Sequence, residues 1–484
     1  MKEKKRLKLK KIHFHPVTAF ILLTGLIILL SGILSFFQVQ ATYSRLNPTT
    51  GTLEKTLVSV ESLLNYNGIK YLISEATKNF ISFTTLSTLL ISLIGLSVAQ
   101  ATGFLDTFIK RVLIKIDNKK ITFMLIFLAT ISSLINEVGY VILIPLSAII
   151  FLKNKRNPLA GIIAAFTGVS FGYGVTIFVG SMEVNLMQTT EQSARLIDQS
   201  YHVALTSNLI IIIISSIILS IIGTLIIEKI IIPKLGKYKD HNEMPLESVE
   251  VKEELEDYEM IEQKKMAEEI REKKGMKNAL ITTIAFIILF IYMLIPNLPF
   301  SGLLLDMDEA TYLGQVFGEN AYFQDGFTYL ISLYFLIVGI AYGLGAKTIT
   351  NDKELVKESG KYIADIGTLI IMIFFAAQFI AVFKKTNLAT IITAWGANII
   401  NSVNFTGIPL IILVVILIAI INLFVTTPVA KWTILAPVVV PKLMQSNISP
   451  EFAQFILRAG DSMTKGITPL LAFFVIFVGY LNMY

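Results

Sequence analysis

The sequence contains no cysteine and only four histidines among its 484 residues. The absence of cysteine excludes disulfide bonds, thiolate catalysis and cysteine-based metal sites. All four histidines lie outside the central apolar segments, which argues against a haem or histidine–metal enzyme. The chain also has no phosphate-binding loop of the Walker type, so ATP-driven chemistry is not encoded here. We therefore expect no enzyme, no cofactor and no bound metal.

Charge is scarce as well: only 16% of the residues are charged, 54% are hydrophobic, and the mean hydropathy is +0.69. The charged residues are segregated, which leaves apolar runs of about 20 residues, long enough to cross a bilayer as helices. This pattern excludes a soluble enzyme, a nucleic-acid-binding protein and a disordered chain. It predicts an all-α polytopic protein embedded in a lipid bilayer.

Basic residues precede the first apolar run, which extends from Val17 to Phe37. Because positive charge beside the first span stays on the cytoplasmic side, we expect a multi-pass protein of the cell membrane with a cytoplasmic N-terminus. The charge pattern predicts a basic N-terminus, a first membrane half, a charged cytoplasmic linker and a second membrane half, at residues 1–15, 16–232, 233–277 and 278–484.

Two apolar runs, near 121–151 and 408–444, are too long for one ordinary helix. The first is interrupted by Asn136-Glu137, and the second around Thr426-Thr427-Pro428. We interpret each as a re-entrant hairpin, which is tolerated at membrane depth where protein or water surrounds the backbone.

The segment after each hairpin is interpreted as a broken transmembrane helix. The first, residues 158–180, is interrupted at Gly172-Tyr173-Gly174, and the polar stretch 183–200 that follows it is expected outside. The second, residues 452–478, is interrupted near Gly460 and Gly466.

The two halves repeat each other at a constant offset of 292 residues. The matching pairs are Tyr140/Trp432, Pro145/Pro437, Pro158/Pro450, Gly168/Gly460, Ser170/Ser462, Gly174/Gly466 and Thr176/Thr468. The basic flanks put the two copies in opposite orientations. An inverted repeat with interrupted helices is the layout of secondary transporters, whose site lies near the membrane midplane.

The last span carries three ionisable residues, Arg458, Asp461 and Lys465. Their i,i+3 and i,i+4 spacing puts them on one helix face, so Asp461 is expected between two cations. Charged groups inside a membrane are costly and are functional candidates by default. The planar fork of Arg458 suits a carboxylate, while Asp461 and Lys465 are expected to couple or gate transport.

Five further side chains are considered as residues of the functional site, each against a purely structural interpretation. Glu137 lies at the first hairpin tip or near the cytoplasmic surface. Glu183 faces an outer vestibule or marks the water boundary. Asn422 belongs to the site or joins two helices. Trp432 stacks on an aromatic ligand or forms part of an interfacial belt. Lys431 snorkels, so replacing it is expected to change little.

Several strings in the chain resemble the p-aminobenzoyl-glutamate transporter (AbgT) family over most of its length. They are His15-Pro16, Pro48 to Gly51, Tyr140 to Pro145, Asn157-Pro158 with Gly161, Leu235 to Tyr238, Lys431-Trp432 through Pro437, and Arg458-x-Gly-Asp-Ser-x-Thr through Pro469. The resemblance implies a homodimeric carrier with two re-entrant hairpins. It also implies as cargo p-aminobenzoyl-glutamate or, in export, sulfonamide antimetabolites.

Carried over by position, the resemblance implies a substrate site built from a small set of residues. These are Trp432, Pro450, Arg458, Asp461 and Pro469, with Asn422 in the hairpin and Glu183 and Glu137 where the family has aspartates. We place Ser462 and Thr176, at the breaks, with the coupling or gating residues.

Thr176 and Lys465 replace asparagines of the family pattern, and amide oxygens suit sodium, a hard cation. We therefore hypothesise that the Lys465 ammonium occupies cation space beside Asp461 and weakens sodium coupling. The coupling ion is then H⁺ or Na⁺.

The sequence thus predicts a secondary carrier of a small aromatic carboxylate or of sulfonamides, working by alternating access. Two alternatives stay open at this point. One is an anion channel that uses the same cationic residues. The other is a membrane receptor that signals through the charged linker.

Overall fold

The computed structural model describes residues 14–46, 52–113, 116–135, 137–236, 238, 255–318, 320–364 and 366–484. The elements of the first half are α1 Pro16–Phe36, β1 Gln40–Leu46, β2 Leu53–Ser59, α2 Tyr66–Ser74, α3 Ala76–Ile81, α4 Thr84–Ala101, α5 Phe104–Phe108, a π-helix η1 Ile109–Leu113, α6 Asn118–Ile131, a 3-10 helix η2 Ser132–Ile135, α7 Val138–Lys153, α8 Pro158–Phe171, α9 Ser181–Ala194, α10 Leu209–Ile226, a π-helix η3 Ile227–Ile231 and α11 Ile232–Leu235.

All secondary-structure elements in the described residues of the second half are helices. Its elements are α12 Leu255–Met293, α13 Tyr312–Phe317, α14 Tyr322–Ala346, α15 Asp352–Ala364, α16 Gly367–Lys385, α17 Leu388–Ser402, α18 Gly407–Asn422, α19 Pro428–Met444, α20 Pro450–Thr464, a 3-10 helix η4 Lys465–Ile467 and α21 Phe474–Met483.

Helices long and apolar enough to cross a membrane recur along the described chain. Seven meet this description: α1, α4, α6 with η2, α10 with its extension to Leu235, the Glu262–Met293 part of α12, α14 and α16. Large apolar side chains on α1, α10 and α12 are exposed, as expected for surfaces that face lipid. The chain is therefore a multi-pass helical membrane protein.

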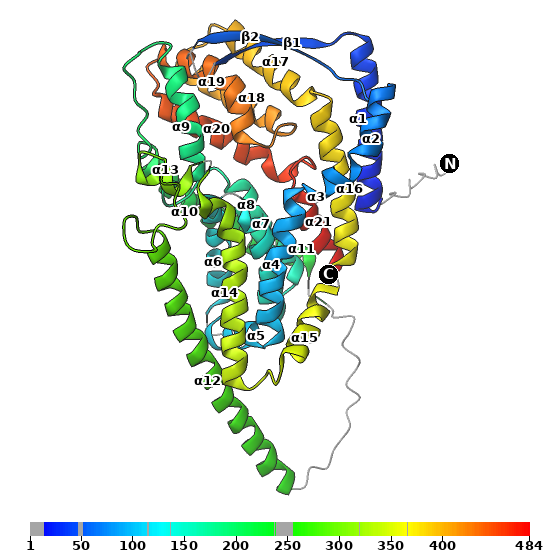
Figure 1. The fold of residues 1–484 in the computed structure, drawn as a ribbon, viewed down its shortest axis with the longest axis vertical. Helices are drawn as coiled ribbons and strands as arrows, with labels where there is room; N and C mark the ends of the chain where they lie inside the picture. Colours follow the sequence, from blue (N-terminus) through cyan, green and yellow to red (C-terminus); the bar gives the residue numbers. More distant parts are fainter. Residues whose placement is uncertain are drawn as a thin grey trace, which may run out of the picture.

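The two predicted hairpins are present as pairs of helices, α6–α7 and α18–α19. The outer ends of the first pair lie together, because Arg156 Nη1 donates to the carbonyl oxygen of Asn118 at 3.1 Å. In the second pair, Lys442 Nζ donates to the carbonyl oxygen of Val403, four residues before α18 begins, and to that of Ile400 in α17 at 2.6 Å. Figure 1 places α18–α20 at the upper end of the molecule and α6–α8 lower down. That both hairpins re-enter the bilayer stays a prediction.

The repeat register has a structural counterpart at the helix starts. Pro158 and Pro450 both occupy the first turn of a helix, where a missing N–H costs nothing. The preceding residues cap these helices: Asn157 accepts from the N–H of Leu159 at 3.0 Å, and Ser449 accepts from the N–H of Phe452 at 3.2 Å. The matching prolines therefore begin matching helices.

The all-α expectation has one exception in the described chain. Strands β1 and β2 form an antiparallel pair from Gln40↔Ser59 to Leu46↔Leu53. They lie beside α17, where Asn398 Nδ2 donates to the carbonyl oxygen of Thr42 at 3.0 Å.

One predicted interruption is wrong. The second broken helix continues through Gly460 and ends only at Thr464, so its interruption lies near Gly466, as predicted for the second of its two breaks. Much of the stretch 183–200 is helical, because α9 buries Leu186 and Thr190 against α19 and α20; that this stretch lies outside stays a prediction. The boundary of the second half at residue 278 also stays a prediction, and α12 continues through that residue.

Several predictions fall on residues that the structure does not describe. The basic segment 1–13, the string Pro48 to Gly51, Asn136, and most of the first half of the charged linker lie outside the described residues.

Gly95 sets the distance between α4 and α14. A Cβ there would lie 2.1 Å from the carbonyl oxygen of Ser332, and Ser332 also accepts from the N–H of Gly95 at 3.0 Å. We predict that Gly95→Ala forces the helices apart at a cost of about 1–3 kcal/mol. Thermal unfolding in detergent measures this. Gly25→Ala is the control, since a Cβ at Gly25 meets nothing within 4 Å; equal melting temperatures for the two variants would contradict the prediction.

Candidate functional site

The two broken helices cross at their interruptions. The first runs from α8 through residues 172–180 to α9, and the second from α20 through η4 and residues 468–473 to α21. The N–H of Gly174 donates to Ser462 Oγ at 2.8 Å. A Cβ on Gly466 would come within 3.0 Å of Ser170 Cβ. A side chain fits at neither position, because a Cβ would meet the backbone carbonyl oxygen of Arg458 at Gly174 and the side chains of Phe171 and Ser170 at Gly466.

These contacts are reciprocal with respect to the repeat. Gly174 of the first copy meets Ser462 of the second, while Gly466 of the second meets Ser170 of the first. The two glycines are 292 residues apart in the sequence, and so are the two serines. The repeat register therefore relates one contact to the other, while the inverted orientation of the two copies stays a prediction.

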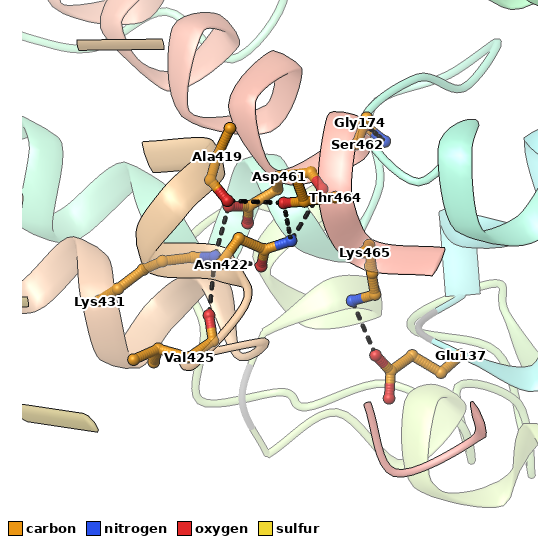
Figure 2. Close-up of polar contacts among 10 residues, drawn as sticks. All are labelled: Glu137, Gly174, Ala419, Asn422, Val425, Lys431, Asp461, Ser462, Thr464 and Lys465. Atoms are coloured by element: carbon orange, nitrogen blue, oxygen red, sulfur yellow. Dashed lines mark hydrogen bonds and ion pairs between the residues drawn. The ribbon is translucent and has the colours of Figure 1, made fainter. Parts of the chain in front are cut away.

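Lys431 and Asp461 form an ion pair that is fully enclosed by protein. The Lys431 ammonium also donates to Asn422 Oδ1 at 2.6 Å and to the carbonyl oxygen of Val425 at 3.0 Å. Asn422 Nδ2 in turn donates to the carbonyl oxygen of Asp461 at 2.9 Å. Figure 2 shows this network joining the second hairpin to α20. Every proton of the ammonium has an oxygen acceptor.

Arg458 pairs with Glu183 through Nη1 and Oε1. The other carboxylate oxygen of Glu183 accepts from the N–H of Gly180 at 2.9 Å and closes the first turn of α9. Arg458 is 2% exposed, and its Nε and Nη2 have no hydrogen-bond partner among the described residues. Unpaired buried donors are costly, so this guanidinium is prepared to bind a further acceptor.

Lys465 contacts Glu137 of the first hairpin, with 2.9 Å between Nζ and Oε1. The ammonium also lies 3.1 Å from the centroid of the Tyr173 ring. Tyr173 and Lys465 are themselves repeat mates, since 465 − 173 = 292.

The predicted arrangement of Asp461 between Arg458 and Lys465 is wrong. Within the described chain each of the three residues pairs with a different segment: Arg458 with α9, Asp461 with α19 and Lys465 with the first hairpin. Helix spacing carries no information about partners from elsewhere in the chain, and the α-helix ends at Thr464, one residue before Lys465. These pairs contain three cations and three carboxylates, so their formal charges cancel.

Two simpler interpretations are also wrong. Lys431 does not snorkel, because its side chain is completely buried and ion-paired. Glu183 does not mark a water boundary, because it is 4% exposed and holds Arg458. Lys431 is the ion-pairing residue whose position the sequence reasoning misjudged; its place inside a long apolar run, beside Trp432, was the signal that could have indicated burial.

Trp432 lies in the apolar core rather than in an interfacial belt. It is fully buried, and its Nε1 donates to Thr190 Oγ1 at 2.8 Å. Gln454 Nε2 donates to the same hydroxyl at 2.8 Å. Trp432 therefore holds α9 against α19.

The other predicted residues take structural positions around the crossing. Pro450 begins α20, and Pro469 lies in the interruption that follows η4. Thr176 Oγ1 donates to the carbonyl oxygen of Phe178 at 2.6 Å and shapes the interruption between α8 and α9.

A cavity of about 380 Å³ opens between the two hairpin tips and α14, a size found for small-molecule sites. Its walls combine hydroxyl, amide and carboxyl groups with two aromatic rings. They include Thr88, Ser133, Glu137, Val141, Tyr173, Met182, Asn185, Asp325, Thr328, Thr427, Pro428 and Phe473. Glu137 is the predicted site residue that lines this cavity. The pairs of Arg458 and Asp461 are not among the described residues that line it.

Comparison with known proteins decides the family. The model of the AbgT putative transporter family matches residues 10–484. The chain belongs to the AbgT family. It is 28% identical over 470 residues to the p-aminobenzoyl-glutamate transport protein of Escherichia coli K12, which covers 97% of this chain and 85% of that protein.

Two solved structures of this transporter family are similar to the chain. The Neisseria gonorrhoeae MtrF structure, described as illuminating a class of antimetabolite efflux pumps, is 32% identical, with a TM-score of 0.50 and coverage of 98% and 90%. The Alcanivorax borkumensis YdaH transporter, described as having an unusual topology, is 28% identical, with a TM-score of 0.48 and coverage of 97% and 92%.

We predict that Lys431→Met strongly destabilises this AbgT-family protein. It would leave Asp461 as an unpaired buried charge, and breaking a buried pair costs about 3–5 kcal/mol. The double variant Lys431→Met/Asp461→Leu should recover much of the melting temperature, because it removes both charges. Thermal unfolding of the purified protein measures both effects, and an unchanged melting temperature for the single variant would show that the pair is dispensable.

Proposed function

We propose that this protein carries p-aminobenzoyl-glutamate or similar aromatic carboxylates, or sulfonamide antimetabolites, across the membrane by alternating access. The names of its relatives supply the substrate classes. The observation that carries the proposal is the buried Arg458 guanidinium, two of whose donors have no partner in the part of the chain that the structure describes. A carboxylate oxygen suits such donors, because charge-assisted hydrogen bonds to arginine are short and strong.

In this proposal the cargo enters through the cavity between the hairpin tips. The rings of Tyr173 and Phe473 line that cavity and stack on the aromatic part of the cargo. Trp432, whose indole N–H already binds Thr190, supports the wall from behind. This changes the role expected for Trp432 from stacking to positioning.

Alternating access requires the broken helices and hairpins to move against the outer helices. We propose that the hairpins re-enter the membrane from opposite faces as an inverted repeat. The N-terminus is then cytoplasmic, because basic residues precede α1. The working unit is proposed to be a homodimer, as the family resemblance implies.

We further propose that a proton rather than sodium couples transport. The position at the crossing where a cation would lie between broken helices is taken by the Lys465 ammonium, which already contacts Glu137. A sodium ion placed at the same crossing would be repelled by the fixed positive charge of the Lys465 ammonium.

Arg458→Ala is predicted to weaken binding of p-aminobenzoyl-glutamate by about 100-fold, the loss expected when one partner of a buried charge contact is removed. Equilibrium binding to the purified protein measures this. Exposed Arg271 on α12 supplies the control, since Arg271→Ala should bind like the wild type. Equal affinity for wild type and Arg458→Ala would overturn the proposed role.

Counterflow of p-aminobenzoyl-glutamate in proteoliposomes should proceed equally well in sodium and in potassium buffers. A saturable exchange also distinguishes a carrier from a channel, which shows no counterflow. Strong dependence of the rate on sodium would refute the assignment of Lys465 as the resident cation.

A further inference from the structure

The two buried lysines at the site, Lys431 and Lys465, differ in the number of hydrogen bonds that their ammonium groups donate. An ammonium has three donors. Lys431 directs them at Asp461, Asn422 and the carbonyl oxygen of Val425. Lys465 is equally buried, yet its Nζ makes no well-aligned hydrogen bond in the described part of the chain. Its contacts are the carboxylate of Glu137 at 2.9 Å and the ring of Tyr173.

Lys465 is also the lysine nearest to the cavity. Both of its contacts, Glu137 and Tyr173, line that cavity. The ammonium is therefore separated from the space between the hairpins by one carboxylate and one ring. Lys431 has no such position, because its contacts lie within the second hairpin and α20.

Charge balance restricts how an anion can enter this site. The three pairs already cancel, so an added carboxylate leaves one buried negative charge without a partner, which is costly. One resident carboxylate has to give way. The side chain of Glu137 is 29% exposed, against 5% for Glu183 and 2% for Asp461. Of the three carboxylates, Glu137 is thus the one whose side chain can leave its lysine and become solvated at the smallest cost in free energy.

We propose that Lys465 is an anion-binding group of the transport site, and that a carboxylate of the cargo replaces Glu137 on its ammonium. The inference rests on the proposed function and identifies the side chain that binds the negatively charged end of the cargo. The ligand class is an organic carboxylate whose anionic end reaches the crossing of the broken helices. No bond is made or broken; one ionic partner is exchanged for another.

The exchange acts on the two hairpins unequally. The ion pair between Glu137 and Lys465 attaches the first hairpin to η4, so displacing Glu137 breaks this attachment. The second hairpin stays attached to α20 through Asp461 and through Thr464, whose hydroxyl donates to the carbonyl oxygen of Ala419 at 2.8 Å. Binding of the cargo therefore loosens the first hairpin and leaves the second in place.

The test is a double-mutant cycle on the purified full-length protein with p-aminobenzoyl-glutamate as the probe. Glu137→Gln removes the competing charge and should tighten binding about tenfold. Lys465→Gln removes the receptor for the carboxylate and should weaken binding about tenfold. In the double variant the gain from Glu137→Gln should vanish, because no ammonium is left to release. The dimethyl ester of the probe, which carries no charge, should respond to neither change.

Two control variants show whether the changes in affinity are specific to the charge at Lys465. Lys361→Gln on α15 removes an exposed lysine that pairs with Glu358, and it should leave affinity unchanged. Lys465→Arg keeps the charge and should retain the effect of Glu137→Gln. If Lys465→Gln does not elute as a single folded species, Lys465→Met replaces it in the cycle, with the same expected loss of the gain from Glu137→Gln.

Two results would overturn the inference. Weaker binding in Glu137→Gln would show that the pair only supports the fold. A gain from Glu137→Gln that persists in the Lys465→Gln background would show that Glu137 acts independently of Lys465. Failure of the wild-type protein to bind the probe would instead sink the proposed function itself, together with this inference.

Discussion

The structure depends on the cost of burying charge where two interrupted helices cross. Cations at lipid depth are tolerated only when each has a carboxylate within reach. Here Arg458, Lys431 and Lys465 each have one, and their partners come from different segments. The ion pairs therefore hold α9, the second hairpin and the first hairpin to one short stretch of α20 and η4. Displacing any of these segments means exposing or re-pairing a charge.

The same constraint connects fold and transport. A site whose charges cancel at rest accepts an anion only by rearranging its own pairs, so binding and movement become one event. Close packing at Gly174 and Gly466 keeps the crossing narrow. The tips of the two hairpins frame the cavity beside it.

Much of this architecture could be predicted from the sequence. Apolar runs of excessive length indicated both hairpins, and the constant offset of 292 residues marked Pro158 and Pro450 as equivalent helix starts. The pairing of charges could not be predicted. Helix periodicity shows which side chains share a face, but it says nothing about which other segment faces them. For that reason Asp461 was assigned to its neighbours on α20, whereas its partner is Lys431 of α19. The depth of α9 was missed because its polar residues satisfy buried partners, as Thr190 does for Trp432.

The 39-residue helix α12 has a simple geometric consequence. At 1.5 Å per residue it is about 58 Å long, roughly twice the thickness of the hydrocarbon layer. The N-terminal half of α12 must then project into water beyond the rest of the molecule (Figure 1). Arg111 holds the helix near the start of this projection through an ion pair with Glu272 at 3.0 Å. A macromolecule approaching from that side meets the end of α12 about 25 Å before it reaches the hydrocarbon layer.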